Sequence, residues 1–370
     1  MSVIHGPHRL EQPSSIECDV LIVGSGAGGS VVADVLTAAG RDVVLLEEGP
    51  FVDSSDVPPS PVQAMPRLWR CGGLTTALGK TPIAYAEGRC VGGGTMINTA
   101  IFQRTSPELL DEWAERYEIA DFGADHLAPY FDRATKAVNA SLTPGDAGPP
   151  TEILRRGSQA LDWKGVDLER SQADCVGTNF CSSGCPTGGK QSMTVTLIPK
   201  ALSNGLRLIA ECRVVRLLRR GNRVVGAKAE ARGHDGRRHP VEIKAGSVFV
   251  CAGAMHTPAL LRRSRLSRNA GRTLRLHPTI RLAASFDEEI NAHEFRVPLY
   301  AVTEFQPDLR LGGSMFSPGL FGILLAEDWE RREHLLGDWR NCCVYYAMVR
   351  AAGVGSVRTV PGAIEPVVQY

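Results

Sequence analysis

The 370-residue sequence lacks a long apolar run, a strong net charge and an apolar segment near its start. Without about 20 consecutive apolar residues, no segment is expected to span a membrane. Lys and Arg (41) nearly balance Asp and Glu (40), so nucleic acid is not an expected partner. Residues 1–15 do not resemble a secretory signal. We therefore expect a cytoplasmic protein whose ten cysteines are thiols or metal ligands rather than disulfides.

The most informative region lies between residues 18 and 48, where a β-branched run, a glycine motif, a helical pattern, a second apolar run and an acid follow one another. The glycines Gly24, Gly26 and Gly29 have the spacing G-x-G-x-x-G. This order predicts a βαβ dinucleotide-binding unit. Gly24 would make the tight turn, Gly26 would let the backbone approach a pyrophosphate, and Gly29 would let helix and strand pack closely.

The acid at the end of the second predicted strand bears on which dinucleotide binds. Glu47 lies 23 residues after Gly24, where it can accept hydrogen bonds from the adenosine ribose. An acid at this position disfavours the 2′-phosphate of NADP. These residues alone leave FAD and NAD as alternatives.

A second glycine-rich segment, GRCVGGGTMIN at 88–98, contains Gly92, Gly93, Thr95 and Asn98. Its backbone carries little side-chain bulk, so it can lie flat against a planar ligand and direct N–H groups at it. The alternative is a flexible surface loop.

Three cysteines lie close together in the segment DCVGTNFCSSGCPTGGKQS at 174–192. Thiolates at the spacing of Cys175, Cys181 and Cys185 can bind zinc or an iron–sulfur cluster. A four-cysteine site would need a distant partner, so bare thiols without a metal are favoured over a metal site.

Most of the remaining pattern predicts secondary structure. Helices are predicted between 107 and 140, with their apolar and aromatic residues, including Tyr117 and Tyr130, in the core. Alternating residues between 206 and 250 predict a β-meander leading to a buried strand at 247–251. A charged helix is predicted at 327–336.

Taken together, the motifs resemble those of the glucose–methanol–choline (GMC) oxidoreductases, FAD-dependent enzymes that oxidise alcohols. The resemblance covers about residues 17–280 and is looser beyond. The segments that carry it are GSGAGGS at 24–30, LLEEG at 45–49, GRCVGGGTMIN at 88–98, GCPTGGKQS at 184–192, VFVCAGAMHTPALL at 248–261 and LRLHP at 274–278.

The resemblance implies an α/β fold: a Rossmann-type FAD-binding domain with a β-meander, plus a partial α+β substrate domain. It divides the FAD domain into residues 17–105 and 191–282, separated by a helical and loop segment at 106–190 that contains the cysteine loop. Residues 283–370 would form the partial substrate domain. The same resemblance places Gly92, Gly93, Thr95 and Asn98 at the flavin ring, backbone near Val214 at the adenine, and Ala252 and Gly253 in the second half of the cofactor domain.

The resemblance also implies the activity. FAD would accept hydride from the CH–OH group of an alcohol, giving an aldehyde or ketone; sterols, long-chain alcohols and sugars are the expected substrate classes, and a redox partner is possible. The resemblance places the family's catalytic histidine in a C-terminal segment beyond residue 370, so no catalytic residue is assigned. We expect this chain to be an N-terminal portion of a GMC enzyme and these 370 residues to oxidise alcohols little. His256 and His277 are predicted to be structural. The rival hypotheses are an FAD and iron–sulfur electron-transfer subunit without catalysis, and an NAD-dependent dehydrogenase.

Overall fold

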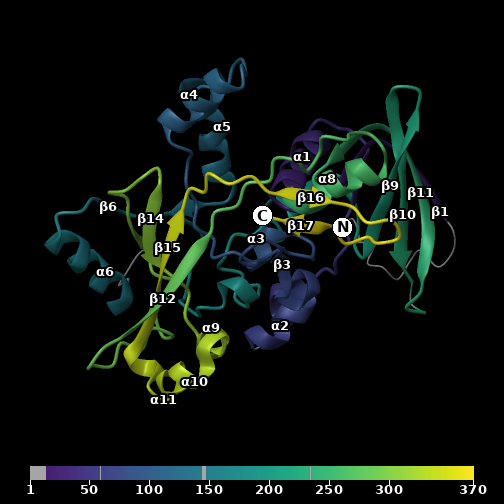
Figure 1. Cartoon of the computed structure of the whole chain (residues 1–370). Coiled ribbons are helices and arrows are strands. Elements are labelled where there is room, and N and C mark those ends of the chain that lie inside the picture. Colours follow the sequence, from purple (N-terminus) through teal and green to yellow (C-terminus); the bar gives the residue numbers. More distant parts are fainter. Residues whose placement is uncertain (1–13, 59, 144–146, 234) are drawn as a thin grey trace.

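The computed structural model describes residues 14–370 except 59, 144–146 and 234. Two β-sheets organise the chain and lie at opposite sides of the molecule (Figure 1). One sheet has six strands and the other has five. No helix in the described residues combines the length and apolar character needed to cross a bilayer.

The six-stranded sheet has the order β8-β2-β1-β11-β10-β9. Its members are β1 (Ser14–Val23), β2 (Val43–Leu46), β8 (Arg207–Ile209), β9 (Cys212–Arg220), β10 (Arg223–Arg232) and β11 (Arg238–Val250). Four neighbouring strands, β8, β2, β1 and β11, are parallel to one another. By contrast, β10 pairs antiparallel with both β11 and β9. The predicted Rossmann-type unit with a β-meander is therefore confirmed.

Helices on both sides explain why the central strands are apolar throughout. The last four residues of β1 and all of β2 are buried. Ile22 and Leu45 on one side pack against α1 (Ala27–Ala38) and α7 (Leu197–Ser203). Leu21 and Leu46 on the other side pack with the meander and α8 (Gly253–Arg263). A parallel strand covered on both faces needs such a continuous apolar run.

The meander differs in detail from the pattern expected at 206–250. The run at 206–210 is not part of it, because β8 joins the parallel edge beside β2. The predicted buried strand at 247–251 is the last part of the 13-residue β11, and this end is half-buried, with Phe249 41% exposed. His234, within the segment predicted to form the meander, lies outside the described residues.

The five-stranded sheet has the order β12-β15-β14-β13-β6. Its neighbouring strands are antiparallel. The members are β6 (Gly165–Asp167), β12 (Thr279–Ser285), β13 (Tyr300–Val302), β14 (Leu309–Gly313) and β15 (Cys342–Val349), with α6 (Pro149–Ala160) and α9 (Pro318–Leu325) beside them. The helix predicted at 327–336 consists of two single turns, α10 (Trp329–Arg332) and α11 (His334–Gly337).

The remaining elements are mostly short. They are η2 (Ser54–Asp56), α2 (Pro61–Leu68), η3 (Arg70–Gly73), β3 (Thr75–Ala77), β4 (Ile83–Tyr85), α3 (Gly94–Ile97), β5 (Ala140–Ser141), β7 (Arg170–Ser171), η4 (Cys181–Ser183), η5 (Ala326–Asp328), η6 (Trp339–Asn341), β16 (Ser356–Arg358) and β17 (Val367–Gln369).

The expected burial of the helices predicted between 107 and 140 is only partly correct, since Leu110 is buried but most of their other apolar and aromatic residues are not. The helices themselves exist. They are α4 (Pro107–Arg116) and α5 (Ala124–Ala137), which project from the body of the molecule (Figure 1). No residue of α5 is buried, and Tyr117 and Tyr130 are 59% and 57% exposed. Helical periodicity identifies an apolar face but does not show whether another element covers it.

Candidate cofactor and substrate cleft

A cavity of about 1440 Å³ opens at the carboxyl ends of β1, β2 and β11. In a doubly wound sheet, ligands bind at this edge of the strands. The cavity continues past Asn98 to α9 beside the second sheet. A single small-molecule site usually measures roughly 300–1,000 Å³, so this cleft has room for a dinucleotide and a second molecule.

The glycine motif at the floor of the cleft contains two kinds of glycine. A Cβ at Gly24 would lie 2.4 Å from the carbonyl oxygen of Cys251, and one at Gly29 would lie 1.9 Å from the carbonyl oxygen of Gly24. Close packing of the chain therefore requires glycine at both positions. A Cβ at Gly26 would meet no atom of the chain within 4 Å, although Gly26 lines the cleft. Glycine at this position suits the close approach of a ligand.

The same turn starts α1. Gly26 is its N-cap residue, and no side chain caps the helix at this end. The first N–H groups of a helix have no partners within the helix and lie at its positive dipole end. They are suited to bind the pyrophosphate of a dinucleotide.

A hydrogen-bond network centred on the buried Ser25 connects this turn to two other loops. Glu47 Oε2 accepts from the Ser25 N–H at 3.0 Å and from Ser25 Oγ at 2.7 Å, and Glu47 Oε1 accepts from the Gly49 N–H at 2.9 Å. The Gly92 N–H donates to Ser25 Oγ at 3.0 Å. We call these four residues the Ser25 network. It fixes the end of β2 and both glycine loops in one arrangement.

Glu47 is 93% buried, and its burial raises the pKa of the carboxyl. A carboxylate has about four acceptor sites, of which the Ser25 network uses three. Glu47 also lines the cleft. Its hydrogen bond to the ribose stays a prediction.

Most of the residues predicted to bind the cofactor lie along this one cleft. Those in its wall are Gly24, Gly26, Glu47, Gly93, Asn98, Val214, Ala252 and Gly253. Gly29, Gly92 and Thr95 lie behind the wall. Thr95 Oγ1 donates to the Gly92 carbonyl at 2.6 Å and accepts from the Met193 N–H at 3.1 Å, so it holds the second glycine loop in place.

A group of buried charges, absent from the sequence-based predictions, forms another part of the wall. Arg70, which is 7% exposed, pairs with Glu48 at 3.1 Å, Glu365 at 3.1 Å and Glu87 at 3.6 Å. His256 Nε2 lies 3.5 Å from Glu365 and 3.7 Å from Glu87. We call these five residues the Arg70 cluster. They come from segments between residues 48 and 365 of the sequence, and only the acidic pair at the end of β2 signals them.

The cluster changes the proton affinities of its carboxyls. The imidazole of His256, 3.5 Å from Glu365 and reinforced by Arg70, lowers the pKa of Glu365 to about 2. Burial opposes the ionisation of Glu48, but Arg70 and two further arginines outweigh it and lower its pKa. Burial raises the pKa of Glu87. The cluster therefore joins the segment before β17 to the cofactor side of the cleft through charged contacts.

Both histidines considered in the sequence line the cleft. His256 is buried within the Arg70 cluster, an arrangement that suits a structural role. His277 is exposed and lies before β12. Their assignment as structural residues stays a prediction.

The cysteine loop packs behind the cleft. Cys175, Cys181 and Cys185 line one small cavity, and Lys190 of the same loop donates to the carbonyls of Met96 and Asn98. Within residues 14–370, apart from the few undescribed positions, no group of three or more His, Cys, Asp or Glu side chains could hold a metal ion. The choice between bare thiols and a cluster stays a prediction.

Comparisons with known proteins agree with this fold and cleft. Residues 19–279 match a family model described as GMC oxidoreductase. The GMC-type oxidoreductase y4nJ of Sinorhizobium fredii is 54% identical over 99% of this chain and 72% of its own length. The long-chain-alcohol oxidase FAO4A of Arabidopsis thaliana is 31% identical, over 74% of this chain and 38% of its own. The crystal structure of pyridoxine 4-oxidase from Mesorbium loti superposes with a TM-score of 0.71 at 17% identity, over 95% of this chain and 75% of its own.

The chain is a flavoprotein of the Rossmann-type class, and it belongs to the GMC oxidoreductase family. FAD is therefore its cofactor, and the rival hypothesis of an NAD-dependent dehydrogenase is not supported. The residues at the cleft fit this cofactor, since Gly26 and the start of α1 offer space and N–H groups to a pyrophosphate.

Replacing Gly26 by valine should abolish FAD binding while the chain still folds, because the side chain would occupy the space beside α1, where an added Cβ meets no atom of the chain within 4 Å. Gly157→Val is the matched control, since Gly157 lies in α6 and a Cβ there also meets nothing within 4 Å. FAD titration followed by flavin fluorescence, with circular dichroism of each variant, measures both effects. Equal FAD affinity in the Gly26 variant and the control would contradict the assignment.

Replacing Glu365 by glutamine should lower the free energy of unfolding by about 1–2 kcal/mol at pH 7. A lowered carboxyl pKa stabilises the folded state above the unfolded pKa, and this contribution disappears as the pH falls towards about 2. The expected loss of about 1–2 kcal/mol is smaller than the full pKa shift would give, because the Glu365 side chain is 48% exposed and solvent screens its ion pairs. Urea unfolding at pH 7 and pH 3 measures it, with Glu330→Gln at an exposed position of α10 as the control. If the difference in free energy of unfolding between the wild-type chain and Glu365→Gln is as large at pH 3 as at pH 7, the ion-pair interpretation is refuted.

Proposed function

We propose that this protein is an FAD-dependent oxidoreductase that acts on the CH–OH group of an apolar alcohol. Membership of the GMC oxidoreductase family supports the reaction type. A related Arabidopsis protein is named for long-chain alcohols, and a Methylovorus relative is named as a 5-(hydroxymethyl)furfural oxidase. This chain spans 38% and 60% of those two proteins, so the activity of a whole enzyme is part of the proposal.

The observation that carries the substrate class is the apolar end of the cleft. Its wall there is formed mainly by α9 and the residues before it: Met315, Phe316, Leu320, Phe321, Ile323 and Leu324. Such a surface favours the alkyl part of a long-chain alcohol or a sterol. A sugar would need several polar groups around its hydroxyls. Of the three classes expected from the sequence, the two apolar ones are favoured.

The residues of the chain have separable tasks in this reaction. FAD, when bound, supplies the hydride acceptor. The turn at Gly26 and the start of α1 bind its pyrophosphate, and the Ser25 network holds both glycine loops in register with it. The wall formed by α9 orients the alkyl chain and excludes water, which lowers the entropic part of the barrier. The alcohol proton must pass to a base, and such a base typically contributes ~10²–10⁴-fold to the rate.

The substrate class is tested by titrating the anaerobic, FAD-loaded chain with 1-decanol and with glucose while the flavin spectrum is recorded. Decanol should perturb the spectrum at a concentration at least ~10-fold lower than glucose. Ile323→Asp should weaken decanol binding at least ~10-fold without changing FAD affinity, because a charge would replace an apolar wall. Ile323 is 51% exposed, so the change is compatible with folding, and Leu161→Asp at a 58% exposed position is the control.

Reaction type is measured in the same samples. Slow loss of oxidised flavin absorbance with equimolar decanal is the expected result. Preferential binding or faster bleaching by glucose would overturn the substrate class, and the absence of any aldehyde from decanol after prolonged incubation would overturn the reaction.

A further inference from the structure

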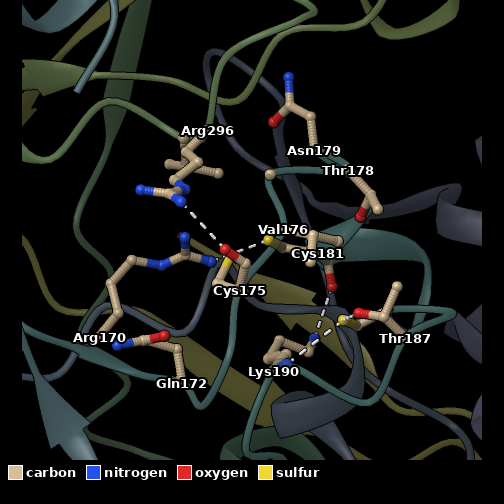
Figure 2. Close-up of a pocket in the computed structure, with 13 residues that line it drawn as sticks. Arg170, Gln172, Cys175, Val176, Thr178, Asn179, Cys181, Thr187, Lys190 and Arg296 are labelled. Atoms are coloured by element: carbon tan, nitrogen blue, oxygen red, sulfur yellow. Dashed lines mark hydrogen bonds between the residues drawn. The ribbon is translucent and has the colours of Figure 1, made fainter. Parts of the chain in front are cut away.

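A second, much smaller cavity lies behind the wall of the FAD cleft, within the cysteine loop (Figure 2). Its volume is about 10 Å³, which is close to the space needed for one water molecule. The residues important here are Arg170, Asn179, Cys181, Cys185 and Lys190, which all line it. We call it the thiol cavity.

Two buried cations lie at the thiol cavity. Arg170 is 1% exposed, and its Nη2 donates to Cys181 Sγ at 2.9 Å (Figure 2). Its Nε donates to the Thr99 carbonyl at 3.1 Å. Lys190 is 3% exposed; its Nζ donates to the carbonyls of Cys181 at 2.5 Å and Met96 at 2.7 Å. Burial lowers the pKa of Lys190 to about 8.

The ionisable groups beside these two cations are thiols rather than carboxylates. Among the described residues, no carboxylate forms an ion pair with Arg170 or Lys190, and the ionisable groups that favour the charge on Lys190 are Cys181, Cys185 and Cys90. A buried charge without an opposite charge is costly. The Arg170 guanidinium, 2.9 Å from Cys181 Sγ, therefore lies where it can stabilise the negative charge that develops on this sulfur as it attacks an oxidant.

The local backbone brings a second thiol to the same place. Cys181 starts the single turn η4, and the chain then reverses at Gly184, which has φ +108°. The Cys185 N–H donates to the Phe180 carbonyl at 3.3 Å, and this hydrogen bond closes a tight loop whose two cysteines, Cys181 and Cys185, line the same small cavity. Asn179, which is 92% buried, adds an Oδ1 atom that has no hydrogen-bond partner at this cavity.

We propose that Cys181 and Cys185 form a peroxide-sensitive thiol pair. The Cys181 sulfur attacks hydrogen peroxide; an S–O bond forms, the O–O bond breaks, and the leaving hydroxide takes the thiol proton to become water, giving a sulfenic acid. The thiol of Cys185 then attacks this sulfur, and a disulfide and water are formed. The two sulfur atoms lose two electrons in total, which the peroxide accepts. The size of the cavity restricts the reaction to oxidants about as small as peroxide.

The pair is connected to the cofactor cleft through Lys190. Its N–H donates to Cys185 Sγ at 3.3 Å, and its Nζ donates to the carbonyls of Met96 and Asn98, which belong to the second glycine loop. A disulfide moves Cys185 and alters the sulfur atom that accepts the hydrogen bond from Arg170. Oxidation should therefore weaken FAD binding, and this part of the inference, unlike the oxidation itself, depends on the assigned cleft.

The test exposes the reduced chain to a small excess of hydrogen peroxide and follows each cysteine by mass spectrometry. A loss of 2 Da and a Cys181–Cys185 linkage are expected, at least ~10-fold faster than oxidation of Cys71, an exposed thiol in the same molecule. Cumene hydroperoxide should not oxidise Cys181 faster than Cys71, because it is too large for the cavity. In Cys185→Ser, a sulfenic acid should remain at Cys181, where dimedone labels it once the peroxide-treated chain has been unfolded.

Because the comparison is made within one wild-type chain, it does not depend on a variant that folds. Oxidation of Cys71 ahead of Cys181, or a linkage that excludes Cys185, would overturn the proposal. Stoichiometric iron with acid-labile sulfide in anaerobically prepared protein would also overturn it, because the thiols would then be cluster ligands. An FAD affinity that falls at least ~3-fold after oxidation, and recovers on reduction, supports the connection to the cleft; unchanged affinity contradicts that connection alone.

Discussion

The arrangement of the cofactor cleft depends on one buried hydrogen-bond network. Ser25 lies between Gly24 and Gly26 and connects the carboxylate of Glu47 with the N–H of Gly92. These groups come from three loops at the carboxyl ends of strands or beyond them. Each is buried, so an unmade hydrogen bond would cost about 1–3 kcal/mol. The network therefore fixes the two glycine-rich loops relative to each other before any cofactor binds.

Charged and polar contacts extend this arrangement outward in two directions. The Arg70 cluster joins the segment around Glu365 to the cofactor side of the cleft. On the other side, Lys190 joins the cysteine loop to the carbonyls of Met96 and Asn98. Both cations are almost fully buried, yet one is paired with carboxylates and the other with carbonyls and thiols. The cleft is thus enclosed by segments that are distant in sequence.

Local patterns predicted the first βαβ unit and its glycines well, because strand burial, G-x-G-x-x-G spacing and the acid at Glu47 are all consequences of local geometry. The burial of α4 and α5 could not be predicted in this way, since an apolar face says nothing of what covers it. Neither Ser25 nor the Arg70 cluster stands out in the sequence, because their partners are set by tertiary packing. The apolar helix α9, which supports the substrate class, was also missed; only its Leu- and Ile-rich run signalled it.

Titrating Ser25→Ala and the wild-type chain with FAD by calorimetry tests the central claim most directly. The substitution removes one donor to Glu47 and the acceptor for the Gly92 N–H but adds no bulk. Two buried groups then lose a partner, so the account predicts at least ~10-fold weaker FAD binding with an unchanged circular dichroism spectrum. FAD affinity equal to that of the wild-type chain would show that the cleft does not depend on the Ser25 network.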